Sequence, residues 1–271
     1  MVGFIDGKTH KLLLKYLINI ISETNGISLV DTLELLANSE IKNENRRAHE
    51  LIESFRKLIS LFQQNEASIL HLLEHPVSQV LFNFFQIFPL KYHEEHIHLT
   101  GALNAEFLFP RLKVLFDGPQ RTLYEKKIKE VYGPNSWPIT SAQDVDNLIR
   151  LKESEGFGTY LRILYLPKLI LVNREAHSDS AYHIAKELYH KFNVGKIRLK
   201  FSLSRVSTNS HEQIPGADDV SPEDVILGLY DGFKNFQNRH PDFNFVLSPS
   251  FRKEASFFDA QNYKTRNSSH L

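Results

Sequence analysis

The stretch HEEHIHLTGAL, residues 93–103, decides the fold. Its first six positions hold three histidines and two glutamates, and an apolar, glycine-containing turn follows. The pattern alternates up to Gly101, which is typical of a strand. The next residues, NAEFLFPRLKVLFDG (104–118), have the apolar spacing of a helix, with Asn104 as its N-cap. The stretch therefore predicts a strand over 94–101 that leads directly into a helix.

Upstream of this strand the chain is almost free of strand signals. From Lys8 to Pro89, leucine and isoleucine recur at three- and four-residue spacing, which indicates amphipathic helices. The spacing predicts four helices, with breaks at Asn25-Gly26, Asn43-Glu44-Asn45 and Asn65 and an internal turn or kink at Pro76. Residues 1–88 are therefore expected to form an all-helical N-terminal lobe.

Downstream, two further stretches alternate as strands do: KIRLKFSLSR (196–205) and FNFVLSPSFR (243–252). Helices are expected between the strands, over 119–131, 141–154, 158–173 and 176–192, and from the N-cap Ser221 onward. Strands that alternate with helices indicate a parallel α/β sheet with right-handed crossovers. The predicted second domain covers residues 89–271.

Composition excludes several classes of partner and site. Basic and acidic residues number 32 each, so no net charge would attract nucleic acid or an anionic membrane. The chain has no cysteine, which excludes disulfides and thiolate ligands and fits a reducing compartment. No apolar run is long enough to span a bilayer. The expectation is a soluble, cytoplasmic protein without nucleic-acid or membrane partners.

His96 and His98 are candidate metal ligands. Side chains two apart on a strand point to the same side, so both imidazoles can converge on one ion. Zn²⁺ accepts imidazole nitrogen, but a catalytic site needs a third protein ligand. With 13 histidines in 271 residues a chance HxH pair is unsurprising, and hydrogen-bonded histidines at a strand end are the alternative interpretation. The position before a Gly-containing turn favours the metal, because barrel enzymes place catalytic groups at strand C-termini.

HIHLTGALNAEFL (96–108) resembles the first-strand motif of the adenosine deaminase family of metal-dependent hydrolases. Two weaker similarities follow: Phe201-Ser202 resembles an aromatic-Ser pair of the family's second strand, and FNFVLSPSFRKE (243–254) resembles its third, which ends in a basic pair. The resemblance covers about residues 89–252, and only the first motif is specific. The helical lobe resembles nothing specific.

The resemblance implies the first three βα units of a TIM (β/α)₈ barrel. It also implies a zinc-dependent deaminase, in which metal-bound water attacks the amine-bearing carbon of a purine nucleoside or base and ammonia leaves. His96 and His98 would hold Zn²⁺, and Thr100 and Ser202 would contact the substrate. At the position of Thr100 adenosine-type members commonly carry Asp, and at Arg198 and Lys200 the family often has Glu and then Arg. The reversal at Arg198 is interpreted as drift on the surface, with a changed interior contact as the alternative.

The family's remaining site residues are missing. A later His, a His and Glu three apart and a late Asp belong to strands beyond the third, and after Phe251 the chain has only His270. The pairs His71/Glu74 and His49/Glu53 lie in the helical lobe and are interpreted as helix surface. No catalytic residue is therefore assigned, and the chain is expected to be truncated and inactive alone. The alternatives are a non-catalytic remnant, a half completed by a second chain that supplies the missing barrel strands, and another HxH metallohydrolase.

Overall fold

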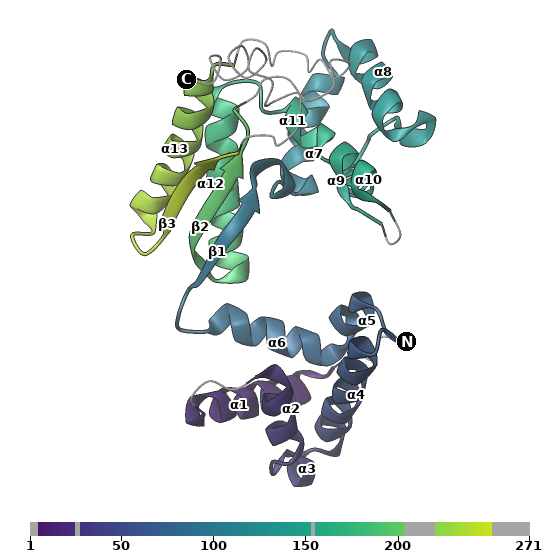
Figure 1. Cartoon of the computed structure of the whole chain (residues 1–271), viewed down its shortest axis with the longest axis vertical. Helices are drawn as coiled ribbons and strands as arrows, with labels where there is room; N and C mark the ends of the chain where they lie inside the picture. The colour runs from purple at the N-terminus through teal and green to yellow at the C-terminus, as the bar shows by residue number, and fades with distance from the viewer. Residues whose placement is uncertain (1–4, 25–27, 153–154, 204–219, 251–271) are drawn as a thin grey trace, which may run out of the picture. The chain divides into compact units, whose positions relative to one another are not determined.

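A computed structural model describes residues 5–24, 28–152, 155–203 and 220–250. The structure is mixed α/β, mostly helical, with one open three-stranded parallel sheet (Figure 1). Contacts divide the chain into two compact units, Met1–Leu90 and Lys91–Leu271. The division falls at the end of the helical region, and each unit is described below by itself.

The first unit is helical throughout its described residues. Each long helix begins at a residue that accepts a backbone N–H, such as Ser28, Asn45 and His75. The structure has two helices more than the four predicted, because the turn or kink expected at Pro76 separates two helices and a short extra helix precedes Asn45. The helices are α1 (Gly7–Glu23), α2 (Leu29–Ala37), α3 (Ile41–Glu44), α4 (Arg46–Gln63), α5 (Ile69–Glu74) and α6 (Pro76–Ile87).

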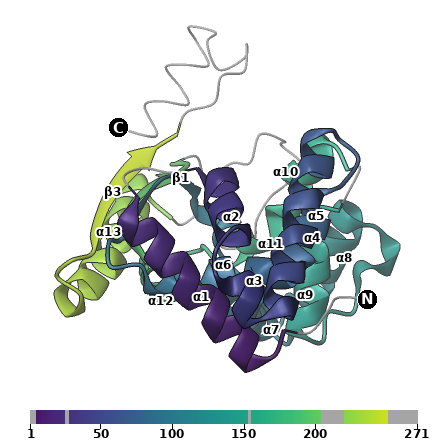
Figure 2. The same cartoon turned by 90° about the horizontal axis from the view of Figure 1, so that it is seen from below.

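Figure 2 shows the helices of this unit from below. Apolar side chains of α1, α2, α3, α4 and α6 form its core. Leu13 and Leu17 are four residues apart on α1, so they lie on one face and are both buried. They pack with Leu36, Ile52 and Val80. The spacing that predicts the helices therefore also predicts which faces are buried.

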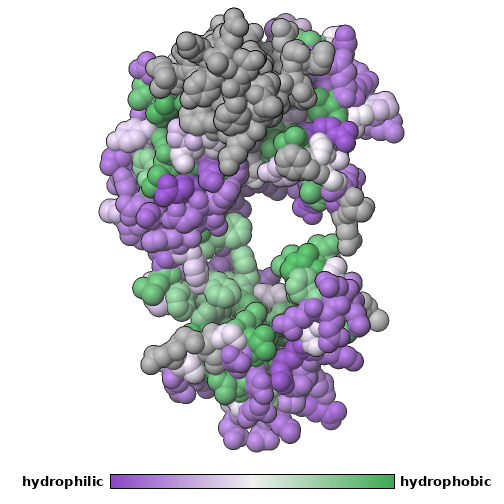
Figure 3. Space-filling view, viewed as in Figure 1, coloured by the Kyte–Doolittle hydropathy of each residue, from purple (hydrophilic) through white to green (hydrophobic). Residues whose placement is uncertain are grey.

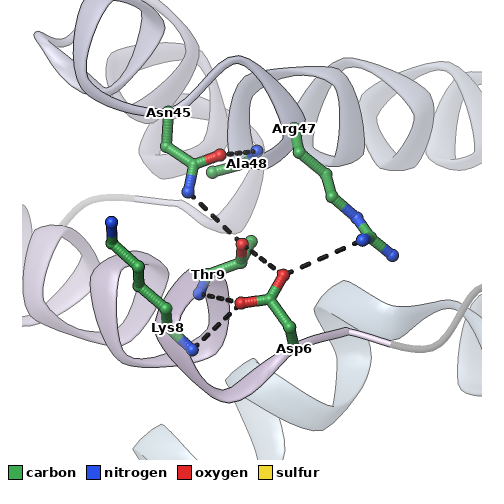
Figure 4. A network of polar contacts seen from close by, with 6 residues as sticks. All are labelled: Asp6, Lys8, Thr9, Asn45, Arg47 and Ala48. Atoms are coloured by element: carbon green, nitrogen blue, oxygen red, sulfur yellow. Dashed lines mark hydrogen bonds and ion pairs between the residues drawn. The ribbon is translucent and has the colours of Figure 1, made fainter.

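A polar network ties the start of α1 to the start of α4 (Figure 4). Asp6 accepts the backbone N–H of Thr9 at 2.9 Å and the Thr9 hydroxyl at 2.8 Å. Asn45 caps α4 by accepting the N–H of Ala48 at 3.0 Å, and its amide donates to the Thr9 hydroxyl at 3.3 Å. Thr9 is 2% exposed, so these bonds satisfy a buried hydroxyl.

The second unit holds the sheet, whose strands are parallel and ordered β1-β2-β3. The predicted strand ends are wrong by several residues. β1 stops at His98, because Leu99–Gly101 turn into a 3₁₀ helix, and β3 stops at Pro249, whose register partner Phe201 is the last residue of β2. Residues 202 and 203 are not strand, and residues 204, 205, 251 and 252 lie outside the described ranges. The strands are β1 (Tyr92–His98), β2 (Val194–Phe201) and β3 (Asn244–Pro249).

The helices of this unit follow the predicted order, with the expected caps at Asn104 and Ser221. The helix predicted over 158–173 is instead two short helices joined at Leu164. The elements are η1 (Leu99–Gly101), α7 (Ala105–Phe116), α8 (Arg121–Tyr132), η2 (Pro134–Ser136), α9 (Ala142–Ile149), α10 (Phe157–Ile163), α11 (Tyr165–Leu169), α12 (Arg174–Phe192) and α13 (Pro222–Arg239).

One face of the sheet packs on α12 and α13, which lie behind the strands in Figure 1. Ile197 and Leu199 of β2 are fully buried there, together with Phe233 of α13. The alternate residues of β2, whose side chains point to the other face, are polar and half-buried: Lys196, Arg198 and Lys200. The sheet therefore has an apolar helix-covered face and a polar face, which we call the open face.

Candidate metal centre

A β-bulge in β1 sets the position of the histidines. Glu94 pairs with Ile197 and Ile97 pairs with Leu199, so β1 has one residue more than β2 over this stretch. Two residues, Glu95 and His96, therefore face a single residue of β2. A bulge locally redirects side chains, and here it brings both of these side chains to the open face beside His98.

The two imidazoles converge as the alternation predicts. The Nε2 atoms of His96 and His98 are 3.1 Å apart at the carboxyl end of β1. Two ligands of a tetrahedral zinc ion with Zn–N bonds of about 2.0–2.1 Å are separated by roughly 3.3 Å. The spacing of the two nitrogens therefore suits two corners of such a site.

The surroundings of His96 suit a metal less well. The Nζ atom of Lys200 is 3.2 Å from its Nδ1 atom. An ammonium only donates, so Nδ1 accepts, and the ring proton of neutral His96 is on Nε2, which donates to His98. A metal-binding histidine normally donates its second N–H to a carboxylate, a carbonyl or water. The nitrogen donors of the two histidines therefore suit a metal. Lys200 does not, because it would have to release Nδ1 of His96 before Nε2 could bind the ion.

Charge at this end of the sheet also opposes a cation. Partial burial lowers the pKa of His98 below its usual range, and His96 and Lys200 lower it further. Glu95 is turned toward Arg198, whose Nε donates to its carboxylate at 2.8 Å. This hydrogen bond lowers the pKa of Glu95, so the carboxylate stays ionised and paired. The Arg198 side chain is 41% exposed, so this ion pair lies on the surface, and the interpretation of the charge reversal as surface drift stays a prediction.

A third protein ligand is not found in the described part of the chain. Among those residues no group of three or more His, Asp or Glu side chains could hold a metal ion. His270 lies outside the described residues. His96 and His98 thus provide two donors, and the structure assigns no further one.

The two predicted substrate contacts lie near the histidines in sequence. Thr100 is half-buried in η1, two residues after His98. Ser202 is exposed and directly follows β2. Both therefore lie just past the carboxyl ends of neighbouring strands, where ligands of open α/β sheets bind.

The sequence interpretation missed the contact of Lys200 with His96 and that of Glu95 with Arg198. Part of the signal is local, because residues 196, 198 and 200 share one face of a strand. The approach to His96 depends on the register with β1, more than one hundred residues away along the chain. Pattern alone therefore indicates which face Lys200 occupies and not its neighbour.

Ser54 and His75, in the helical unit, form a second candidate site, but His75 does not activate Ser54 as a nucleophile. The Nε2 atom of His75 is 2.9 Å from the Ser54 hydroxyl, the geometry of a serine–histidine pair. However, Nδ1 of His75 accepts the N–H of Val77, so Nε2 holds the proton and donates. The Ser54 hydroxyl in turn donates to the carbonyl of Leu51. His75 therefore caps α6 and cannot take a proton from Ser54.

No protein-family model matches the chain, and no curated protein matches its sequence. Among the described helices, none combines the length and the apolar character needed to cross a membrane.

Proposed function

We propose that this chain is an adenosine deaminase-like protein in which His96 and His98 are two ligands of a Zn²⁺ ion. The observation that supports it most is the convergence of the two Nε2 atoms, 3.1 Å apart, at the carboxyl end of a parallel strand. The resemblance of HIHLTGALNAEFL supplies the reaction class, hydrolytic deamination of a purine nucleoside or base. In this proposal the three strands correspond to the first three of a (β/α)₈ barrel.

A non-catalytic protein, or a half completed by a second chain, is the second candidate. Two observations favour it: Lys200 holds Nδ1 of His96, and the described residues provide no third ligand. Two imidazoles alone bind zinc weakly compared with the three or four protein ligands of established sites. In this candidate the chain binds a metal or a purine ligand and releases no ammonia by itself.

Zinc content measured by elemental analysis tests the metal site. The purified chain is compared with a His96→Ala, His98→Ala double variant after both are dialysed against the same zinc buffer. A His49→Ala, His71→Ala variant removes two imidazoles from the helical unit and serves as the matched control. We expect bound zinc in the native chain and the control and its loss in the first variant. Equal zinc in all three chains would refute the assignment.

Ammonia release from adenosine, adenine and AMP separates the two candidates. Deamination that disappears with the His96→Ala, His98→Ala substitution supports a hydrolase. Zinc binding without deamination supports the non-catalytic protein or the chain completed by a partner.

A further inference from the structure

The open face of the sheet is positively charged. By register with β2 and through the bulge in β1, the side chains that share this face are His93, Glu95, His96 and His98 of β1, Lys196, Arg198 and Lys200 of β2, and Asn244, Val246 and Ser248 of β3. Three of these carry a full positive charge and one a negative charge. In Figure 3 the strands face the viewer, and hydrophilic side chains predominate over them.

This charge is unusual for a parallel sheet. Parallel strands are normally covered on both faces and read as nearly continuous apolar runs, and barrel interiors are layers of branched apolar side chains. β2 instead alternates strictly, with Ile197 and Leu199 buried and their neighbours cationic. Covering this face with apolar groups would desolvate the cations, which costs several kcal/mol per ion unless each is paired. The face therefore suits water or an anionic ligand.

The donors concentrate at the carboxyl end of the strands. Lys200 lies beside His98 in register and 3.2 Å from Nδ1 of His96. Ser248 of β3 is its register partner on the other side and contributes a hydroxyl. Arg198 lies one pleat earlier, and Glu95 fixes its Nε. An ammonium, imidazole N–H groups, a hydroxyl and the remaining guanidinium N–H groups are the donors that bind phosphate oxygens.

We propose that this end of the open face binds the phosphate group of a small molecule, with Lys200 as the main contact and Arg198 and Lys196 as supporting charges. The position agrees with the general placement of ligands outside the carboxyl ends of parallel strands. An anion also resolves the mismatch at His96, because the lysine that opposes a metal attracts a phosphate. Phosphate binding at this face does not require a metal at His96 and His98.

Calorimetric titration of the metal-free, EDTA-treated chain with inorganic phosphate tests this site, and AMP is titrated in parallel. We expect saturable binding that weakens as NaCl is added, because the contacts are charged. A Lys196→Gln, Lys200→Gln variant should bind at least about tenfold more weakly, the loss expected for roughly one charged hydrogen bond. AMP bound more tightly than phosphate would identify the source as a nucleotide, and equal affinity would identify it as the free anion.

Lys11→Gln with Lys42→Gln is the matched control, because it removes two exposed charges from the helical unit. This control should bind phosphate as the native chain does, and thermal unfolding checks that both variants are folded. Absence of saturable binding, or an equal loss in the control, would overturn the proposal. The proposal would also be overturned if the native chain formed an oligomer that bound no phosphate and dissociated in the Lys196→Gln, Lys200→Gln variant. The open face would then be a protein interface. Zinc content of the same preparations is measured separately, so the metal proposal can fail while phosphate binding persists.

Discussion

The Nε2 atoms of His96 and His98 lie 3.1 Å apart, and the ammonium of Lys200 lies 3.2 Å from the other ring nitrogen of His96. The first distance suits two ligands of one ion. The contact with Lys200 keeps the His96 ring in the tautomer whose Nε2 atom carries the proton and cannot bind that ion. The two contacts therefore make opposite demands on one imidazole. Lys200 decides which demand is met.

Replacing Lys200 should strengthen zinc binding. In Lys200→Gln the amide oxygen can accept a hydrogen bond from the Nδ1–H group of His96, which leaves Nε2 free for the metal. Groups in this position typically change metal affinity by about 10- to 100-fold. Competition with a zinc-binding dye measures the affinity, with Lys11→Gln as the charge-matched control. Unchanged or weaker zinc binding would show that the lysine does not oppose the metal.

Stability should fall as the pH drops below about 6.5, the usual pKa of histidine. Burial lowers the pKa of His177 and His183 in the folded protein, so the unfolded chain binds more protons below that pH. The stabilisation is complete above the unfolded pKa and is lost as protonation favours the unfolded state. Urea unfolding midpoints at pH 7.5 and 5.5 measure the difference, and a midpoint that is higher at pH 5.5 would contradict it.

His183→Phe should flatten that pH dependence. The His183 ring stacks on Phe107 with centroids 4.3 Å apart, and its buried Nε2 atom has no hydrogen-bond partner among the described residues. Phenylalanine keeps the stacked ring, removes an unsatisfied polar atom and does not titrate. The variant should be at least as stable as the native chain at pH 7.5 and lose less stability at pH 5.5. An unchanged pH dependence in His183→Phe would contradict the prediction.

Gly232→Ala should destabilise the sheet unit. A Cβ atom there would lie within 2.8 Å of the Ala181 side chain and closer still to the Ser178 carbonyl, because α12 and α13 touch at this point. Overpacking of this kind typically costs 1–3 kcal/mol, roughly, in the free energy of unfolding. Gly158→Ala is the control, since a Cβ atom on α10 meets nothing within 4 Å. The control should be neutral or slightly stabilising in urea unfolding, and equal losses in both variants would argue against close helix packing.

Asn45→Ala should weaken the helical unit by roughly 1 kcal/mol, the usual effect of removing an N-cap. The substitution removes the cap of α4 and the donor to the buried Thr9 hydroxyl. Asn43→Ala, which removes only an exposed bond to Glu40, is the matched control. Hydrogen exchange of the α1 and α4 amides measures the local effect. Protection that is equal in both variants would show that the network of Figure 4 contributes little.

The sequence by itself determined the parts of this protein that depend on local periodicity. Three- and four-residue apolar spacing places Leu13 and Leu17 on one buried face, and two-residue alternation places His96 and His98 on one side of a strand. Capping preferences likewise predict Asn104 and Ser221 as helix starts. These features need only the chain's own geometry. Element ends were less well predicted, because Leu99 begins a 3₁₀ turn directly after β1 and β3 ends where its partner strand β2 ends.

Only the tertiary structure decided the features that depend on pairing between distant segments. The bulge at Glu95 and His96 exists only relative to β2, and Arg198 finds Glu95 across 103 positions of the chain. Lys200 reaches His96 through the same register. A one-residue shift between parallel strands would exchange the faces of these side chains, and nothing local in either strand fixes that register. The character of the site, a histidine pair restrained by a lysine, is therefore a property of the sheet and not of the motif.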